Sequence, residues 1–308
     1  MRITPDFTAV IVTSGQRPEL LRAAVRSMIT QDHSGQIEII VVFDHVAVDP
    51  LTDLSPGLRR SLRTVSSHHT PGLTGGRNTG IEIARGDVIG FCDDDDEWLP
   101  HKVAEQLRLW SAHPRASAVS GGILLRSGGA DHRLAAPAQV ELADLLRSRI
   151  SSLASSSTTY RRADLLPTGR IGPFDENLPA AYGEDYDMLL RAAHVGTIHA
   201  LTDPCVHILW DRTSFFSGHW QKLAQGLTYL LRKFPEFEKS PRGAARIAGQ
   251  IAFAQAAQGN RREAFRWIRA ALRRDPLQLR AWAAVPVAGC LVPASWLVRV
   301  VEKTGHGL

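Results

Sequence analysis

Short apolar runs alternate with amphipathic segments through the first third of the chain. Phe7–Thr13 and Ile37–Phe43 are rich in β-branched residues and almost continuously apolar, which is typical of strands covered on both faces. Between them, Pro18–Ile29 has apolar residues at helical spacing, with proline at a position that helices tolerate. The same signals predict strands at Ser61–Ser66, Val88–Cys92 and Ala116–Leu125, and helices at Thr74–Ala84 and Pro100–Trp110. This alternation predicts an α/β fold with an open, mostly parallel sheet and helices on both faces.

The pattern changes after residue 217, where helical spacing continues and no segment is typical of a strand. Within this region Gly249–Pro276 resembles one tetratricopeptide-type helix pair, with Gly259 at its turn. We therefore expect two parts, a sheet-containing domain over residues 1–217 and an all-α region over residues 218–308. The helices expected in the second part are Trp220–Phe234, Gly243–Gln258, Arg262–Arg274 and a long one over Leu279–Val301.

The segment Ala281–Val298 contains no charged residue and is long enough to be considered as a membrane span. Pro286 and Pro293 interrupt it, so we expect a buried or interfacial helix here instead. The amino-terminal segment lacks the basic region and long apolar run of a signal peptide. A cytoplasmic location is therefore expected.

The 308 residues carry a net charge of +5, but this charge is unevenly distributed. Residues 218–308 contain 15 of the 36 Lys/Arg residues and 5 of the 31 Asp/Glu residues, so the helical region is basic and the remainder acidic. The three cysteines, Cys92, Cys205 and Cys290, have no CxxC spacing. Their pattern argues against a disulfide framework or a zinc site.

Four consecutive aspartates, Asp93–Asp96, follow the predicted strand Val88–Cys92. Adjacent carboxylates repel one another, which rarely benefits a fold. A hard divalent cation removes the conflict, because Mg²⁺ or Mn²⁺ binds one or two carboxylates together with substrate phosphate oxygens. In open parallel sheets ligands bind beyond the carboxyl ends of the strands, where Thr13 and Asp44 are also expected. The cluster predicts a metal site, and a solvated acidic loop is the alternative.

Three segments, in this order, resemble motifs of family 2 glycosyltransferases of the GT-A fold. They are Gly72–Gly80 (GLTGGRNTG), Ala84–Asp87 (ARGD) and Phe91–Trp98 (FCDDDDEW), which are similar to the family's GLSxARNxG, ARGEY and LDxDD patterns. The upstream stretches IVTSGQRPELL and VVFDH resemble the family's opening strand and its second strand with an aspartate. The resemblance implies a Rossmann-like, mostly parallel sheet and an inverting, metal-dependent transfer of a sugar from a nucleotide-activated donor.

The resemblance also implies roles for individual residues at these motifs. Thr13 and Asp44 would line the nucleobase pocket, with Asp44 as an acceptor for a base N–H. Arg77 would reach the base or the diphosphate, for which a guanidinium is suited. Asp94 would contact the ribose or the metal.

The metal ligands implied by the resemblance are Asp93 and Asp95, which have the DxD spacing and would hold Mn²⁺ or Mg²⁺. Asp95 is the stronger candidate for direct coordination, although four adjacent aspartates leave the register open by one residue. His207 is a further candidate ligand, but an isolated histidine in a strand is more often a packing residue.

A second segment with two carboxylates also resembles the family. Gly172–Leu178 (GPFDENL) precedes Gly183–Arg191 (GEDYDMLLR), and in the family the aspartate of the ED pair is the catalytic base. Asp185 would then be the base, and Glu184 would hydrogen-bond to the donor or the acceptor. A helix is expected to begin at this pair, and its amino-terminal dipole favours an ionised carboxylate. The nearby run Ser151–Thr159 either faces the acceptor or links into a strand.

These features predict a glycosyltransferase that moves a sugar from a nucleotide-diphospho-sugar, with UDP as the expected nucleotide, to a hydroxyl of a glycan or another acceptor. One base for the acceptor and one metal for the leaving diphosphate complete the chemistry without a covalent intermediate. A sugar nucleotidyltransferase or a non-catalytic nucleotide-sugar-binding protein is the alternative. A nicotinamide-dependent oxidoreductase is excluded, because Ile11–Pro18 has one glycine where GxGxxG is needed. No nucleic-acid-binding motif is recognised.

Two interpretations of the basic helical region stay open. Its arginines could hold the enzyme at the inner face of an anionic membrane with a lipid-linked acceptor, since each basic residue near such a surface contributes about 1 kcal/mol. Otherwise the region packs on the catalytic domain and leaves its arginines in water. The residues concerned are Arg261, Arg262, Arg266, Arg269, Arg273 and Arg274.

Overall fold

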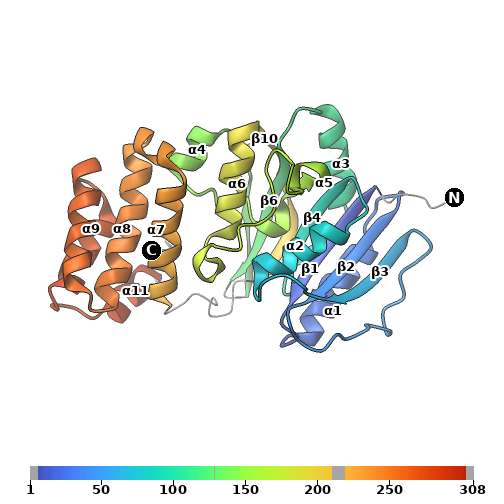
Figure 1. Cartoon of the computed structure of the whole chain (residues 1–308), viewed down its shortest axis with the longest axis horizontal. Coiled ribbons are helices and arrows are strands. Elements are labelled where there is room, and N and C mark those ends of the chain that lie inside the picture. The colour runs from blue at the N-terminus through green and yellow to red at the C-terminus, as the bar shows by residue number, and fades with distance from the viewer. Residues whose placement is uncertain (1–5, 128, 210–218, 303–308) are drawn as a thin grey trace. The chain divides into compact units, whose positions relative to one another are not determined.

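The structure of the chain is a computed structural model that describes residues 6–127, 129–209 and 219–302. Figure 1 shows its β-sheet and the helices that precede and follow the strands. The strands are β1 (Phe7–Thr13), β2 (Ile37–Phe43), β3 (Arg60–Ser66), β4 (Val88–Asp93), β5 (Glu97–Trp98), β6 (Ala118–Ser127), β7 (Ala130–Leu134), β8 (Gln139–Val140), β9 (Thr159–Arg161) and β10 (Ile198–Leu209).

The sheet is mostly parallel, as the sequence predicted. Its strands lie in the order β3-β2-β1-β4-β9-β6-β10-β5, with β7 beside β6 and β8 beside β10. The pairs β1–β2, β2–β3, β1–β4 and β6–β10 are parallel, and β9 is antiparallel to both of its neighbours. The bounds of β1 and β2 are those predicted, because each apolar run is buried along its entire length.

Helices flank the strands and continue after the last of them. They are α1 (Pro18–Ile29), α2 (Leu73–Ile83), α3 (Lys102–Ala112), α4 (Leu142–Arg147), α5 (Arg162–Leu165), α6 (Glu184–Val195), α7 (Trp220–Lys233), α8 (Pro241–Ala257), α9 (Arg261–Arg274), α10 (Leu279–Ala288) and α11 (Ala294–Glu302). Short 3₁₀ turns are η1 (Ser155–Ser157), η2 (Pro179–Ala181) and η3 (Pro235–Lys239).

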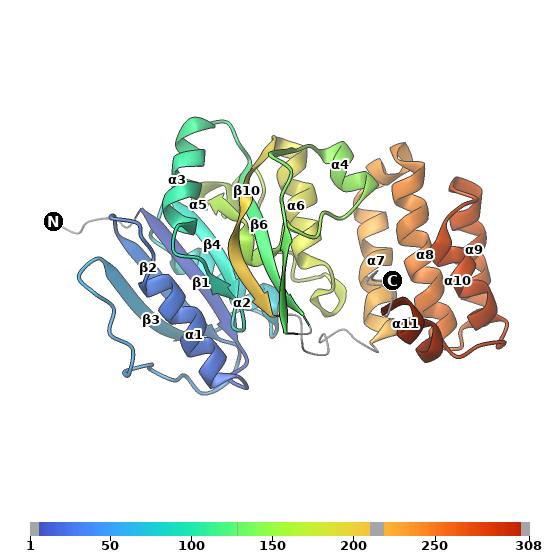
Figure 2. The same cartoon turned by 180° about the vertical axis from the view of Figure 1, so that it is seen from behind.

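Helices α1 and α2 cover opposite faces of β1. Ala9 and Ile11 point into the core that α1 completes, whereas Val10 and Val12 touch α2. Successive side chains of a strand alternate between faces, so these contacts place the two helices on opposite sides of the sheet. Figures 1 and 2, which are opposite views, show the same arrangement.

The register of the strands brings the candidate site residues to one edge of the sheet. Thr13 pairs with Phe43 across β1 and β2, and Val12 pairs with Asp93 across β1 and β4. The three strands therefore end at nearly the same level. Ligands bind at such carboxyl ends in open parallel sheets.

Two glycines allow α2 to lie directly against β1. A Cβ atom added at Gly76 would lie 2.5 Å from Cγ1 of Val12, and one added at Gly80 would lie 2.3 Å from Cγ1 of Val10. Any larger residue at either position would push the helix away from the strand. The glycines therefore determine the position of Arg77, which lies between them.

By its contacts the chain divides into two compact units. Of the described residues, the first unit contains those of 6–142, 150–176 and 184–209, and the second those of 143–149, 177–183 and 219–302. The second unit is helical. In it, α8 and α9 are joined by a turn at Gly259, which has a φ of 78°, and they pack through Phe253, Ala264 and Ile268.

One predicted helix is wrong. The long helix expected over Leu279–Val301 is two helices, α10 and α11. The chain leaves α10 at Gly289, and Cys290 adopts a left-handed conformation with a φ of 59°. Pro293 then precedes α11, so helical hydrogen bonding cannot continue through this turn. Within the ranges that the structure describes, the helices are all too short or too polar to cross a bilayer.

Candidate active site

A buried arginine connects the two carboxylate segments. Nη2 of Arg77 donates to Oδ1 of Asp93 at 2.8 Å, and Nη1 donates to Oε1 of Glu184 at 3.0 Å. The guanidinium also lies over the rings of Phe174 and Phe91, 5.1 and 5.8 Å from their centroids. Burial opposes the charge of Arg77, but Asp93 and Glu184 outweigh it and raise the pKa of the guanidinium. The structure thus brings two segments that are distant in the sequence into one site.

The aspartates alternate between inward and outward positions. The side chain of Asp94 is 3% exposed, whereas those of Asp93 and Asp95 are 41% and 20% exposed. Asp96 is also buried. This alternation separates the four carboxylates into an inner pair and an outer pair.

Thr13 and Arg17 hold the inner carboxylate of Asp94. Oγ1 of Thr13 donates to Oδ2 of Asp94 at 2.6 Å, and the guanidinium of Arg17 contacts both Asp94 and Asp95. Burial raises the pKa of Asp94, although the Thr13 hydroxyl and the Arg17 charge act in the opposite direction. Thr13 therefore contacts the site through Asp94.

The second inner carboxylate, Asp96, is held by the serine-rich segment. Oγ of Ser156 accepts from the backbone N–H of Asp93 at 3.1 Å and donates to Oδ2 of Asp96 at 2.5 Å. Burial, together with the charge of Asp93, raises the pKa of Asp96 well above its ordinary value. The run Ser151–Thr159 leads into β9 but also supports the aspartates from inside, a role that neither interpretation of the sequence included.

Asp44 lies at the end of β2, as predicted, and holds the beginning of α2. Both oxygens of its carboxylate accept from the backbone N–H of Gly72 at 3.0 Å. Gly72 has a φ of 117°, which favours glycine at this position. Asp44 thereby positions the first turn of the helix that carries Arg77.

The predicted helix at the second carboxylate segment is confirmed, and α6 begins at Glu184. Oδ1 of Asp185 accepts from the backbone N–H of Tyr186 at 2.7 Å, in the first turn of this helix. Burial and the neighbouring charge of Asp185 raise the pKa of Glu184 to about 7, although Arg77 opposes the shift. The first turn of α6 therefore carries both carboxyls, and that of Glu184 is paired with Arg77.

The outer carboxylates fit a hard divalent cation. Asp93 and Asp95 offer partly exposed oxygens at the edge of the sheet, and Mn²⁺ or Mg²⁺ takes one or two carboxylates in addition to phosphate oxygens. Arg17 also contacts Asp95. A metal ion bound at Asp95 would therefore either share the carboxylate with the guanidinium of Arg17 or displace that guanidinium. For His207, Nε2 lies 3.2 Å from Oδ1 of Asp131, and its role as a ligand stays a prediction.

Three residues of this site were missed by the sequence reasoning. They are Arg17, Ser156 and Asp96. Asp96 was named as part of the aspartate run, but its burial was not predicted. Arg17 had a weak signal, since it is the basic residue in the turn that follows the first strand. Ser156 lies in the run Ser151–Thr159, whose polar composition did not indicate a contact with the aspartates.

Comparisons with known proteins show which family and fold the chain is similar to. Residues 9–165 match the family model described as Glycosyl transferase family 2. The UDP-Glc:alpha-D-GlcNAc-diphosphoundecaprenol beta-1,3-glucosyltransferase WfaP of Escherichia coli is 27% identical over 105 residues, which cover 34% of this chain and 41% of that protein. The chain thus matches less than half the length of this relative.

Two solved structures are similar to the whole chain. S. aureus TarS 1-349 in complex with UDP-GlcNAc has a TM-score of 0.60 at 17% identity, covering 98% of this chain and 92% of that one. The mannosyltransferase PcManGT from Pyrobaculum calidifontis, in complex with GDP-Man and Mn²⁺, has a TM-score of 0.55 at 19% identity, covering 98% and 87%. At these identities the likeness shows a shared GT-A fold.

The raised pKa of Glu184 predicts a pH-dependent stability. Between the ordinary value of 4.5 and about 7 the folded chain binds a proton that the unfolded chain has released, so stability falls as the pH rises through this window. In Glu184→Gln the amide oxygen can still accept from Arg77, but the side chain cannot titrate. We therefore expect the urea midpoint of this variant to fall less between pH 5 and pH 8 than that of the wild type. The exposed control Glu19→Gln should keep the wild-type slope. Parallel slopes for all three proteins would contradict the assignment.

Proposed function

We propose a function from one premise: the chain belongs to glycosyltransferase family 2. The proposed reaction transfers a sugar, with inversion, from a nucleotide-diphospho-sugar to a hydroxyl group of a glycan or another acceptor. The observation that carries this proposal is the pair of hydrogen bonds from Arg77 to Asp93 and Glu184. Through them the aspartates proposed to bind the donor lie beside the carboxyls proposed to act on the acceptor.

The donor side of the site consists of residues at the ends of three strands. We assign the metal-binding role to Asp93 and Asp95, and contacts with the nucleoside to Asp44 and Asp94. Thr13 donates to Asp94, and Arg77 donates to Asp93 and Glu184, so in this proposal both are positioning residues for these carboxylates. Mn²⁺ or Mg²⁺, when bound, would neutralise charge on the leaving diphosphate.

UDP is the proposed nucleotide. The relative from E. coli is named for UDP-Glc, and TarS was solved in complex with UDP-GlcNAc. The Pyrobaculum enzyme was solved with GDP-Man, so the fold itself does not select the base.

The acceptor side of the site consists of the first turn of α6. Asp185 accepts the proton of the acceptor hydroxyl as its oxygen attacks the anomeric carbon and the bond to the diphosphate breaks. Glu184 uses one oxygen to accept from Arg77, and its second oxygen is proposed to contact the donor or the acceptor. Glu184 already accepts from Arg77, whereas Asp185 lies beside it in the first turn of α6, which supports assigning the role of base to Asp185.

Metal dependence of donor binding is the first test. UDP titrated calorimetrically with Mn²⁺ should bind at least about tenfold more tightly than UDP titrated with EDTA, because the cation links diphosphate and carboxylates. Asp95→Asn should lose this difference, and Asp32→Asn, at an exposed loop position, should keep it. NAD should not bind. Equal UDP affinity with and without the metal would exclude the assigned ligands.

The assignment of the base is tested by Asp185→Asn. The amide cannot take a proton, so we expect transfer to slow by about 10²–10⁴-fold while UDP affinity stays unchanged. The control Asp87→Asn, an exposed residue before β4, should transfer at the wild-type rate. The same assay distinguishes the alternatives, since a nucleotidyltransferase releases diphosphate from a nucleoside triphosphate and a binding protein forms no product. Normal turnover of Asp185→Asn would remove this residue from the mechanism.

The helical region over residues 218–308 is proposed as a separate part that brings the enzyme to the inner face of a membrane. The acceptor in the name of the E. coli relative is alpha-D-GlcNAc-diphosphoundecaprenol, which is a sugar carried on a lipid diphosphate. In α9, Arg262, Arg266, Arg269 and Arg273 are exposed and follow one another at spacings of four, three and four residues. These spacings place them on one face, opposite the buried side chains of the same helix.

Liposome co-sedimentation tests the membrane proposal. Wild-type protein should bind vesicles with anionic lipid more strongly than neutral vesicles, and less so at high salt, because screening weakens the attraction. Reversing Arg262, Arg266 and Arg269 to Glu should abolish this binding. The matched control reverses Arg26, Arg108 and Arg115, which are exposed in the first unit, and should keep it. Negligible wild-type binding to both kinds of vesicle would refute the proposal.

A further inference from the structure

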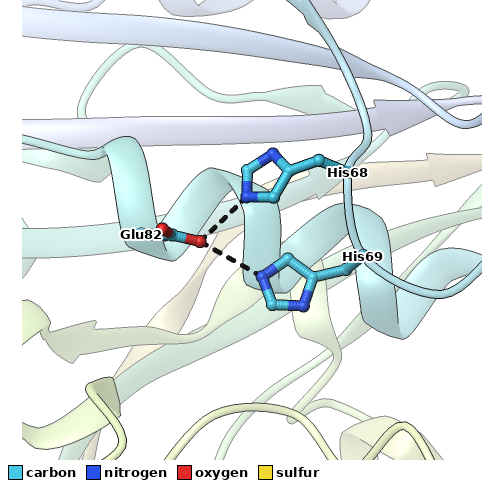
Figure 3. A group of neighbouring side chains, drawn as sticks. All are labelled: His68, His69 and Glu82. Atoms are coloured by element: carbon cyan, nitrogen blue, oxygen red, sulfur yellow. Dashed lines mark hydrogen bonds and ion pairs between the residues drawn. The ribbon is translucent and has the colours of Figure 1, made fainter.

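Two histidines and a glutamate meet outside the aspartate site. His68 and His69 lie between β3 and α2, and Glu82 lies in the last turn of α2. Nε2 of His68 is 2.9 Å and Nε2 of His69 is 3.2 Å from Oε2 of Glu82. Figure 3 shows both rings turned toward this carboxylate. Within the part of the chain that the structure describes, His68, His69 and Glu82 form a group whose potential ligand atoms all lie within 4.8 Å of one another. No other group of three or more His, Cys, Asp or Glu side chains in that part meets this criterion.

The backbone is arranged so that two consecutive side chains point the same way. Neighbouring residues in a strand point to opposite faces, but β3 ends at Ser66 and the chain bends at His69. Nε2 of His45 donates to the carbonyl oxygen of His69 at 2.9 Å, and Oγ1 of Thr79 accepts from the N–H of His68 at 3.3 Å. Both histidines are therefore held by contacts of their own backbone.

The second ring nitrogen of His69 has a carboxylate partner. Nδ1 lies 2.9 Å from Oε1 of Glu176. Metal-binding histidines commonly donate their other N–H to a carboxylate, which orients the ring and raises its basicity as a ligand. Glu176 is itself held in place, because its Oε2 accepts from the backbone N–H of Thr70 at 3.1 Å and its Oε1 accepts from Nδ2 of Asn78 at 2.7 Å.

From this geometry we propose that His68, His69 and Glu82 bind a divalent transition metal ion, for which Zn²⁺ is the probe of choice. Two imidazole nitrogens and one carboxylate oxygen suit Zn²⁺, whereas Mg²⁺ prefers oxygen ligands alone. In a tetrahedral site with bonds of about 2.0–2.1 Å, neighbouring ligand atoms lie about 3.3 Å apart. The separations of 2.9 and 3.2 Å are close to this value. The cysteine pattern gave no reason to expect zinc, because these ligands are histidines.

The site is open to solvent and linked to the active site. The side chains of His68 and Glu82 are 53% and 63% exposed, so an ion can enter and three protein ligands leave a fourth position for water. Glu176, which orients His69, accepts from Nδ2 of Asn78 at 2.7 Å, and Asn78 adjoins Arg77 on α2. A bound ion would therefore restrain α2, the preceding bend and Glu176 together, which makes it a stabilising site for the catalytic unit.

The test is a Zn²⁺ titration of the tag-free, full-length chain against a chromophoric chelator, with millimolar Mg²⁺ present to occupy oxygen-only sites. We expect one tight equivalent of Zn²⁺, and a Co²⁺ complex with the visible absorption of a tetrahedral site. His68→Gln and Glu82→Gln should lose this equivalent, and Glu176→Gln should weaken it by about 10–100-fold, the usual effect of removing such a partner. His132→Gln, at an exposed position in β7, is the control and should bind as the wild type does.

Two results would overturn the proposal. In the first, the wild type binds no Zn²⁺ under these conditions, and the cluster is then a hydrogen-bonded group without a metal. In the second, the ion is lost from an Asp93→Asn/Asp95→Asn double variant and retained by His68→Gln, which would place it at the aspartates. Retention of Zn²⁺ by the double variant together with its loss in Glu82→Gln would support the site.

Discussion

A buried guanidinium that has to be neutralised determines how the first unit is arranged. Burying a cation without partners is strongly unfavourable, and the partners of Arg77 come from the end of β4 and the start of α6. These two segments must therefore meet for the unit to be stable. Removing Asp93 or Glu184 would take away one of the two carboxylates that pair with the buried guanidinium. Asp93 is for this reason a part of the fold as well as a candidate ligand.

In the structure, the repulsion among the four aspartates is reduced by hydrogen bonds and by arginine partners. The inner carboxylates of Asp94 and Asp96 accept from hydroxyl groups, and burial raises the pKa of each. The outer carboxylates are paired with Arg77 and Arg17. The repulsion between these carboxylates, from which a metal site was predicted, is therefore a weaker argument for a metal once the structure is known. The stronger argument is the outward position of the DxD pair, which an isolated acidic loop would not require.

The sequence predicted the parts of the fold whose signals are local. The bounds of β1, α1 and β2 follow from apolar runs or helical spacing with clear ends. The turn at Cys290 was missed because nothing local requires a cysteine to adopt a positive φ. In the site, the motif residues were predicted, but Ser156 was not, since its importance depends on its tertiary position beneath the aspartates. The cluster of His68, His69 and Glu82 was also missed because it depends on tertiary position. The two histidines precede α2, and Glu82 lies in the last turn of that helix.

The close contact between α2 and β1 also limits how the site can be re-engineered. Val12 touches the helix at Gly76 and Val10 touches it at Gly80, where the helix has no side chain that could change rotamer in response. A bulkier residue on that face of the strand would move α2 as a rigid body and carry Arg77 with it. Such a change in β1 would therefore alter the spacing between the proposed donor and acceptor sides of the site.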